Sequence, residues 1–350
     1  MHLFFLLAAL GCQPLTADDP PVEGDTDADT DADTDADTDT DTDTDTDTDT
    51  DTDTDTDTDA DTDADTDTDT DADTEPDWLP RTAAEVCGRW DSARQDLDEG
   101  TWSGAVNTCS VGTLSDRGRE NALRVTNLYR WLAQLPEVGH DPARDEGAMA
   151  CALMMDAADA LSHAPGTDWP CYSADGAEEA GWSNIASGPG VMAVDMYMVD
   201  PGNPDTLGHR RWILSNSAGP IGLGSTADYS CMSVLYGSGH AGRAWTAWPS
   251  PGVFPVEAFD VFTWTHLDAT GWSFQSDTLN LSGAQVQVTD GGNNRPVTVH
   301  TLSGGYGSSQ AISFTPQGWT VSPGHTYQVR VTGAFGEVTY PVEVVDCGAL

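Results

Sequence analysis

An alternating acidic repeat limits how much of this 350-residue chain can fold. From Asp25 to Thr74 every second residue is Asp, with Thr or Ala between. The repeat has no apolar side chain larger than Ala, so burial cannot offset the entropy cost of ordering it, and repulsion between like charges keeps it extended. We predict that residues 13–75 are a long disordered acidic linker. A calcium-binding role is the alternative, but the repeat lacks the turn-forming Gly of calcium loops.

The charge of the chain argues against one class of partner. Lys and Arg number 13 against 59 Asp and Glu, which gives a formal net charge of −46, and every basic residue is Arg. Without the 25 Asp residues of the repeat the charge is still −21. An acidic field of this size repels nucleic acid and anionic lipid headgroups. We expect no nucleic-acid partner, and membrane contact only through an N-terminal lipid anchor.

The first twelve residues resemble an export signal. The apolar run from Leu3 to Leu10 is too short to span a bilayer and fits the hydrophobic part of a signal peptide. It ends in Ala9-Leu10-Gly11-Cys12, which is similar to the lipobox of bacterial lipoproteins, where the Cys is acylated. We predict an export signal at 1–12, lipidation of Cys12, and a place in the cell envelope (outer membrane or surface) or secretion. A plain signal peptide with an incidental Cys12 is the alternative.

Six cysteines remain once Cys12 is set aside, and an even number in an exported protein implies three disulfides. Six cysteines allow 15 pairings. Proximity in the sequence favours the pairs Cys87–Cys109, Cys151–Cys171 and, by remainder, Cys231–Cys347. On this pairing, residues 76–115 form a disulfide-clipped extension, and the last bridge ties the ends of two domains together.

Two kinds of apolar periodicity follow the extension. Spacing of three and four residues predicts helices, and a hairpin follows them at 221–236, so we expect a mixed α/β layered domain at 116–247. From Pro249 onward apolar residues alternate with polar ones between Gly-rich turns, which predicts an all-β sandwich of immunoglobulin type at 250–350. The predicted helices are 121–135, 144–161, 191–199 and 207–214.

Five short motifs stand in the first of these domains. They are Asn127-x-x-Arg130, Ser162-His163, Ser183-Asn184-Ile185-Ala186-x-Gly188, Gly208-His209-Arg210-x-x-Ile213-Leu214 and Ile221-Gly222-Leu223-Gly224. The same elements occur in this order in the CAP superfamily (SCP domains), the family of cysteine-rich secretory proteins, antigen 5 and pathogenesis-related 1. Residues 120–240 resemble its bacterial branch. The resemblance implies an α+β fold, with a CAP-type α-β-α layered domain followed here by the all-β sandwich.

The resemblance also implies a cleft with two His and two acidic residues, which in several members bind a divalent metal such as zinc. Imidazoles from two loops together with carboxylates make a sound donor set for such a metal. His163 and His209 match the two His positions and are the predicted metal ligands. Ser183 stands where the family has Glu, directly before Asn184. The carboxylates that could complete the site are Glu178, Glu179, Asp195 and Asp200.

These residues also have structural alternatives. His163 could cap the second predicted helix or bond a backbone carbonyl, and His209 could orient the 207–214 turn. Arg210 and Arg211 are expected to be solvated or paired with the acidic surface. Ser162 stands beside His163, but adjacent residues seldom point at each other and no Gly-x-Ser-x-Gly elbow is present, which disfavours a serine hydrolase.

Because the set of acids is incomplete, we expect a ligand-binding protein rather than an enzyme. The leading hypothesis is an exported, lipid-anchored surface protein whose His-lined cleft binds a lipid- or sterol-like molecule or a partner protein. The first alternative is a metal-dependent hydrolase or protease, with a metal-bound water at His163 and His209 and Glu179 as general base. The second is a structural or adhesive surface protein.

Overall fold

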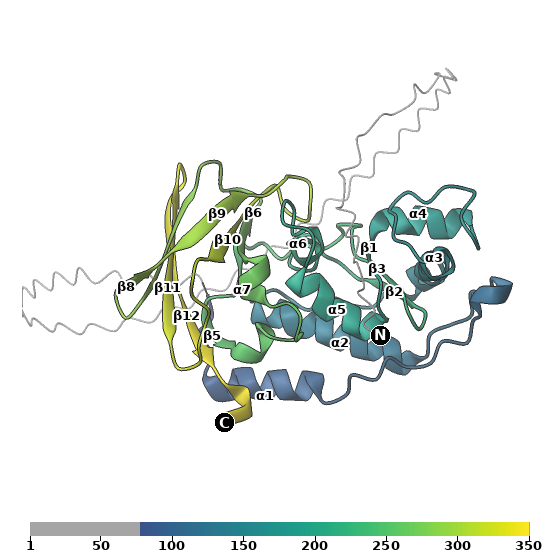
Figure 1. Ribbon diagram of the computed structural model, residues 1–350, viewed down its shortest axis with the longest axis horizontal. Coiled ribbons are helices and arrows are strands. Elements are labelled where there is room, and N and C mark those ends of the chain that lie inside the picture. The colour runs from purple at the N-terminus through teal and green to yellow at the C-terminus, as the bar shows by residue number, and fades with distance from the viewer. Residues whose placement is uncertain (1–77, 350) are drawn as a thin grey trace, which may run out of the picture. The chain divides into compact units, whose positions relative to one another are not determined.

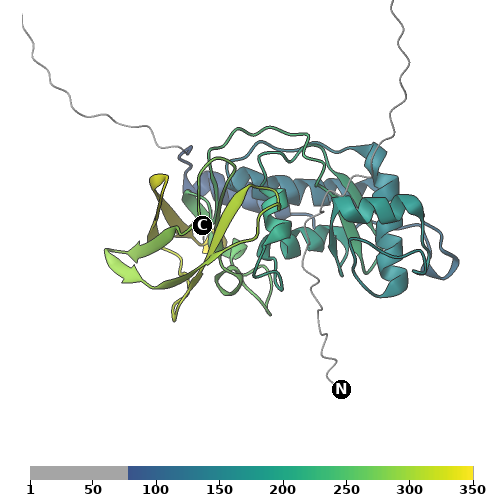
Figure 2. The same ribbon diagram turned by 90° about the horizontal axis from the view of Figure 1, so that it is seen from above.

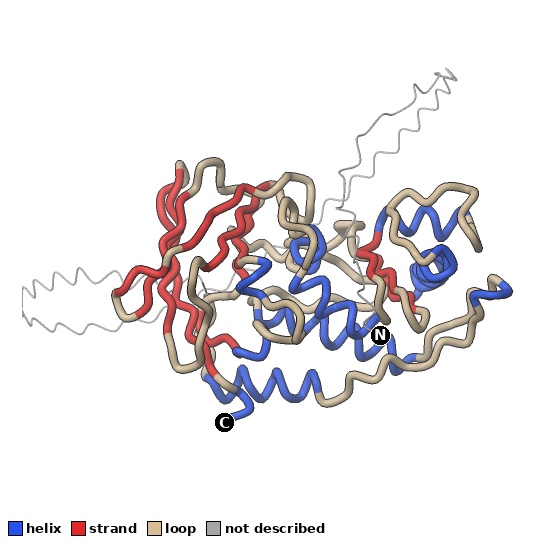
Figure 3. Tube along the Cα trace, in the orientation of Figure 1, coloured by secondary structure: helices blue, strands red, loops and turns tan. Residues whose placement is uncertain are grey.

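The computed structural model describes residues 78–349, which all belong to one compact unit. The predicted export signal, Cys12 and the Asp/Thr linker lie outside the described residues. Within 78–349 no helix is long and apolar enough to cross a membrane. Figure 1 shows helices around a small sheet, followed by a C-terminal group of longer strands, and Figure 3 colours the helices blue and the strands red.

The first part of the described chain is a three-layered α-β-α arrangement. Its sheet has the order β1 (Ser183–Ala186), β3 (Ser230–Ser233), β2 (Gly222–Ser225), with antiparallel pairing throughout. Helices α3 and α4 pack on one face of the sheet, and α5 and α2 on the other (Figures 1 and 2). The helices are α1 (Ala83–Arg94), α2 (Asp116–Leu132), α3 (Asp145–Ala158), α4 (Ala174–Trp182), α5 (Gly190–Val199) and α6 (Gly208–Ile213), with 3-10 turns η1 (Val106–Thr108) and η2 (Pro142–Arg144).

The glycines of the 221–224 motif let α3 lie directly on β2. A Cβ on Gly224 would come within 2.1 Å of the backbone of Ala148, and one on Gly222 within 2.5 Å of Arg144. Leu223, between them, points to the opposite face because side chains alternate along a strand. The motif is therefore a helix-packing surface on one face and a core contributor on the other.

The four predicted helices and the predicted hairpin are confirmed, but two helices were not expected. Both begin with a side-chain cap rather than with a strong apolar stripe. At α1 the Thr82 hydroxyl accepts the Glu85 N–H while the Glu85 carboxylate accepts the Thr82 N–H, which is a capping box. At α4 the hydroxyl of Ser173 accepts the N–H of Gly176.

The prediction of three disulfides is supported, but all three predicted pairings are wrong. The bridges are Cys87–Cys347, Cys109–Cys171 and Cys151–Cys231. Cys151 on α3 is fully buried against the sheet and faces Cys231 of β3, so it cannot reach the surface loop that holds Cys171. Cys87 is carried by α1 to the C-terminal end of the chain, so residues 76–115 are not clipped to themselves. Proximity in the sequence fails as a guide because packing between layers brings distant cysteines together.

The remaining strands form the β region, residues 246–345, which contains two sheets. One has the order β4-β6-β10-β9 and the other β5-β12-β11-β7-β8, in which β5 and β12 are parallel and the other pairs antiparallel. All strands predicted after Pro249 are present. The strands are β4 (Thr246–Trp248), β5 (Gly252–Pro255), β6 (Trp272–Ser276), β7 (Gln285–Asp290), β8 (Asn293–Arg295), β9 (Val297–Thr301), β10 (Gln310–Pro316), β11 (Thr326–Gly333) and β12 (Gly336–Val345).

The largest apolar core cluster of the described residues runs through both parts, beside two smaller clusters. It joins buried residues of α1, α2 and α5 to the inner faces of both sheets of the β region. The Trp248 ring lies 5.6 Å from that of Tyr129 in α2 and 4.8 Å from that of Phe254 in β5. Three short helices, η3 (Val256–Ala258), α7 (Leu267–Thr270) and η4 (Cys347–Ala349), connect or end the strands. The β region is thus packed into the helical part instead of following it on a linker.

Candidate functional site

Asp200 holds the beginning of α6 and the ring of His209. Its side chain has no exposed surface and follows the last residue of α5, where a left-handed backbone (φ 54°) turns the chain. The carboxylate accepts the backbone N–H groups of His209 at 3.1 Å and Arg210 at 3.4 Å, as a helix N-cap does. It also lies 2.9 Å from Nδ1 of His209. Because a carboxylate only accepts, Nδ1 carries the proton and the imidazole has one fixed orientation.

Three polar side chains complete this group. Asn203 Nδ2 donates to Asp200 at 2.7 Å. Asn184 Nδ2 donates to the backbone carbonyl of His209 at 3.1 Å, and the Tyr197 hydroxyl donates to the carbonyl of Asn184 at 3.0 Å. The Tyr197 ring lies 5.1 Å from that of His209. The structure therefore brings Asn184 and His209, which belong to two of the motifs, together with Asp200, which belongs to none of them.

Glu179 places a carboxylate beside Ser183, which stands where the family has Glu. The two residues are four apart across the end of α4, so they lie on the same face. The Ser183 hydroxyl donates to Oε1 of Glu179 at 3.4 Å, and both side chains are buried. Glu178, the other candidate, is exposed. Helix α4, which apolar periodicity did not predict, buries Glu179 beside Ser183 and leaves Glu178 exposed.

A stacked aromatic group next to Glu179 was not predicted. The Tyr236 hydroxyl donates to Oε2 of Glu179 at 3.0 Å, and its ring stacks on Trp182 with centroids 4.9 Å apart. The guanidinium of Arg144 lies 3.9 Å from the centre of the Tyr236 ring. Burial, together with the charge of Glu179, raises the pKa of Tyr236 to about 12. The one sequence signal for this group is that Trp182 directly precedes the 183–188 motif.

His163 contacts the same helix. Its Nδ1 lies 2.8 Å from the backbone carbonyl of Ala180, to which it donates. This contact is the backbone bond considered as the structural alternative for His163. The bond ties His163 to Ala180, the residue that follows Glu179 in α4.

Asp195 does not belong to this site. Its carboxylate binds both terminal nitrogens of Arg94 on α1 at 2.8 Å and accepts the Tyr129 hydroxyl at 2.5 Å. Burial raises the pKa of Tyr129, so this hydroxyl stays protonated as a donor. Asp195 and Tyr197 lie on different faces of α5. The prediction that Asp195 could supply the second acid is wrong, and Asp200 takes the place beside His209.

The donor set does not fit the metal site that the resemblance implies. Among residues 78–349 there is no group of three or more His, Cys, Asp or Glu side chains that could hold a metal ion. We therefore derive no chemistry through a metal here.

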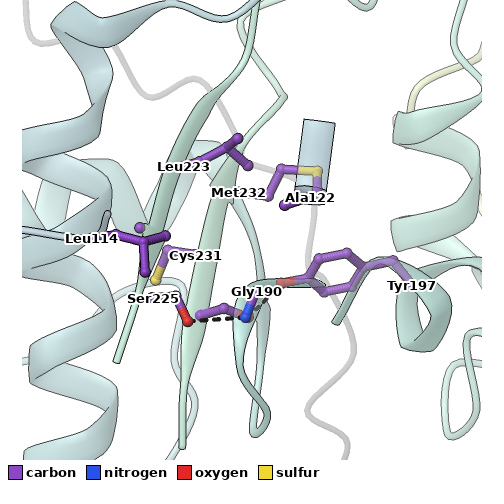
Figure 4. A pocket seen from close by; sticks show the side chains of 10 residues that line it. Leu114, Ala122, Gly190, Tyr197, Leu223, Ser225, Cys231 and Met232 are labelled. Atoms are coloured by element: carbon purple, nitrogen blue, oxygen red, sulfur yellow. Dashed lines mark hydrogen bonds between the residues drawn. The ribbon is translucent and has the colours of Figure 1, made fainter. Parts of the chain in front are cut away.

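Two cavities lie near these elements. The first, of about 10 Å³, is lined by α2, α5 and the small sheet and includes Tyr197, Leu223 and Met232 (Figure 4). It has room for no more than one water molecule. The second is an open groove of about 400 Å³ between α1 and η3, with Trp90, Glu257 and Asp260 in its walls. Neither of these two cavities is lined by His163 or His209.

The expectation that Arg210 and Arg211 face solvent or an acidic surface is wrong. Both are fully buried, with no exposed area. Their guanidinium groups donate mainly to backbone carbonyls, several of them in the β region. Burial lowers the pKa of each to about 10, so both are still charged at neutral pH. Local sequence cannot show this, because their acceptors in the β region lie 60 to 97 positions away.

Comparison with known proteins agrees with this architecture. Residues 123–237 match the model of the CAP family, described as the cysteine-rich secretory protein family. The match covers about a third of the chain and supports its relationship to the CAP superfamily, within an α+β fold that has a β-rich C-terminal region. No curated protein and no solved structure is significantly similar to the chain. CAP proteins are typically secreted, and three disulfides fit an extracellular protein.

Proposed function

We propose that this chain is an exported, lipid-anchored surface protein of the bacterial CAP branch, and that its CAP domain binds a small apolar ligand beside His209 and Glu179. The observation that carries the proposal is the buried Asp200 carboxylate, which fixes the ring of His209 through a 2.9 Å hydrogen bond. Such preorganisation favours recognition because the site loses little entropy when a ligand binds. The nearby serines have structural partners, since Ser183 bonds Glu179 and Ser162 accepts the N–H of Ala164.

An apolar ligand suits the aromatic group at the edge of this site. Tyr236 is 37% exposed and stacks on Trp182, and its ring also contacts the Arg144 guanidinium, so an aromatic group lies next to the Glu179 carboxylate. A lipid- or sterol-like molecule is our first choice of ligand. Binding of a partner protein at the same face is the second. The metal-dependent hydrolase is not favoured, because the described donor set does not fit a metal.

We also propose that the chain holds a CAP domain followed by an immunoglobulin-like sandwich, and that the sandwich begins at β4 (Thr246–Trp248), a few residues before the expected boundaries of 116–247 and 250–350. The sheet orders β4-β6-β10-β9 and β5-β12-β11-β7-β8 support the second assignment. They correspond to the A-B-E-D sheet and to a G-F-C sheet extended by one strand at each edge. The inner faces meet through aromatic side chains, with the rings of Trp272 and Tyr327 6.1 Å apart.

Titration of the oxidised mature chain with a fluorescent sterol tests the binding proposal. We expect saturable binding that is about tenfold weaker in His209→Ala and in Tyr236→Ala, each loss corresponding to about 1.4 kcal/mol. Arg117→Met is the matched control, because Arg117 is 59% exposed and pairs with surface acids. If His209→Ala and Tyr236→Ala both leave the affinity for the sterol unchanged, the proposed binding site is wrong. If the wild type turns over a substrate and His163→Ala or His209→Ala loses that turnover, the site is catalytic and the binding proposal is wrong.

A further inference from the structure

Arg210 joins the end of α5 to the β region. Its Nε donates to the carbonyl of Met198 at 2.6 Å and one terminal nitrogen to that of Val199 at 2.9 Å, the two residues before Asp200. The other terminal nitrogen donates to the carbonyl of Gly271 at 2.7 Å, and the hydroxyl of Thr270 accepts a further bond at 3.1 Å. One buried cation therefore holds the backbone that positions Asp200 and the turn between α7 and β6.

Arg211 makes a second connection on the other side of α6. It donates to the carbonyl of Thr206 at 3.1 Å within its own turn. It also donates to the carbonyls of Ser303 at 2.6 Å and Ser308 at 3.0 Å, and to the hydroxyl of Ser308 at 3.1 Å. Arg210 and Arg211 directly follow His209 on one short helix, so together they tie this helix to two separate loops of the β region.

The backbone of residues 205–214 also lies directly against the β region. A Cβ on Gly307 would come within 2.4 Å of the carbonyl oxygen of Arg211, and one on Gly208 within 2.9 Å of the Tyr306 ring. Leu207 has a left-handed backbone (φ 43°) and is buried against Leu302 and Ala311. A non-Gly residue keeps such a conformation only when its surroundings enforce it.

Two further hydrogen bonds close the ends of this segment. The N–H of Ser303 donates to the carbonyl of Asp205 at 2.9 Å. The side chain of Gln275 donates to the carbonyl of Leu214 at 2.7 Å. The segment that carries His209 is therefore held by the β region at its beginning, middle and end.

We propose that Arg210 and Arg211 are positioning residues of the His209 site, and that residues 270–275 and 303–308 of the β region are structural parts of that site. The physical reason is that a buried guanidinium needs acceptors for its N–H groups, and the β region supplies many of them. If these acceptors move, the cation and the helix turn on either side of it must move too. The β region is then a frame for the CAP site and not only the spacer or interaction module that the sequence suggests. This inference rests on the proposed binding role of His209.

The test uses mild changes in the β region, because removing a buried arginine leaves many buried acceptors unpaired and threatens folding itself. Thr270→Val removes the hydroxyl that accepts from Arg210, and Ser308→Ala removes the one that accepts from Arg211. Thr298→Val and Ser282→Ala are matched controls at exposed positions of the same region. The two readouts are the NMR resonance of the His209 Nδ1 proton, assigned by its loss in His209→Gln, and the affinity for the fluorescent sterol. The oxidised mature chain is used throughout.

We expect Thr270→Val and Ser308→Ala to shift the His209 resonance and to weaken sterol binding by about fivefold. The two controls should do neither. Folded Thr270→Val and Ser308→Ala proteins with an unshifted resonance would overturn the inference. If the wild-type protein binds no sterol, the proposed ligand fails, but the resonance still decides whether the β region positions His209.

Discussion

Asp200 is the residue on which the candidate site depends most. It has no exposed side-chain surface, and it accepts hydrogen bonds from two backbone N–H groups, from Asn203 and from the ring of His209. A buried carboxylate is tolerated only when its charge and lone pairs are satisfied in this way. Burial lowers the pKa of Arg210, and the Asp200 charge opposes that shift.

Replacing Asp200 by Ala should destabilise the fold by about 3–5 kcal/mol, because it leaves several buried hydrogen-bond donors without their acceptor. Urea unfolding of the oxidised chain measures the loss. Asp116→Ala is the control, since the side chain of Asp116 is 87% exposed. A loss for Asp200→Ala no larger than that of the control would contradict the role given to this carboxylate.

The charge of Glu179 should have a measurable effect on the pKa of its neighbour Tyr236. Burial is the first cause that raises the pKa of Tyr236 to about 12, and the Glu179 charge and hydrogen bond follow. Glu179→Gln removes the charge, so we expect the pKa of Tyr236 to fall towards its ordinary value of 10. Ultraviolet titration of tyrosinate, taken as the difference from the same chain with Tyr236→Phe, gives this pKa. An unchanged value would place the Glu179 carboxylate away from the ring.

At the scale of elements, the helix ends position the site. α5 begins where the Glu99 carboxylate accepts the N–H groups of Val191 at 2.6 Å and Met192 at 2.9 Å, and it ends at Asp200, which in turn begins α6. α4 ends directly at Ser183, so its last turn sets Glu179 beside β1. These contacts at the helix ends set the distances between the polar side chains of the site.

The cap of α5 should give a specific dependence of stability on pH. Burial raises the pKa of Glu99 above its ordinary value of 4.5, and Asp195 and Asp98 add to the rise, while the two backbone N–H groups oppose it. The folded state therefore holds this proton more tightly than the unfolded state. The resulting stability is complete below pH 4.5 and is lost as the pH rises through the folded pKa.

Glu99→Gln removes this titration. We expect the free energy of unfolding of the wild type, minus that of Glu99→Gln, to decrease between pH 4 and pH 7, roughly the window above the ordinary glutamate pKa. Urea unfolding at several pH values measures the difference. A difference that grows with pH would show that the hydrogen bonds outweigh burial.

At the scale of the whole described chain, the helical part and the β region are joined by a disulfide, by buried hydrogen bonds and by apolar packing. Cys87–Cys347 links α1 to the end of the chain across 260 positions. Arg210 and Arg211 bind the β region around His209, and the core passes from α2 into both sheets. Because these contacts involve residues far apart in sequence, neither part has a complete set of partners without the other.

Removing Cys87–Cys347 should therefore cost more than removing a shorter bridge. Cys87→Ser with Cys347→Ser opens a loop of 260 positions, whereas Cys109→Ser with Cys171→Ser opens one of 62. Loop-closure entropy predicts a loss of about 2–5 kcal/mol for the first pair, roughly 1 kcal/mol more than for the second. Urea unfolding of both double variants checks this order, and a reversed order would show that local packing outweighs loop length.

The sequence by itself determined the local features of this protein. Apolar spacing predicted α2, α3 and α5 and the strands of the β region, because one face of each element is buried and burial follows the period of that element. The motifs at 183–188 and 208–214 led to the CAP resemblance, and the cysteine count led to three disulfides.

Only the tertiary structure decided which distant residues meet. It paired Cys87 with Cys347, chose Glu179 over Glu178, and turned Asp195 towards Arg94 while Asp200 holds His209. It also buried Arg210 and Arg211 against carbonyls of the β region, although adjacent Arg residues on an acidic chain look solvated. The physical reason is that a residue's periodic neighbours are encoded nearby in the sequence, whereas the partner of a cysteine, a carboxylate or a guanidinium is set by how whole layers pack.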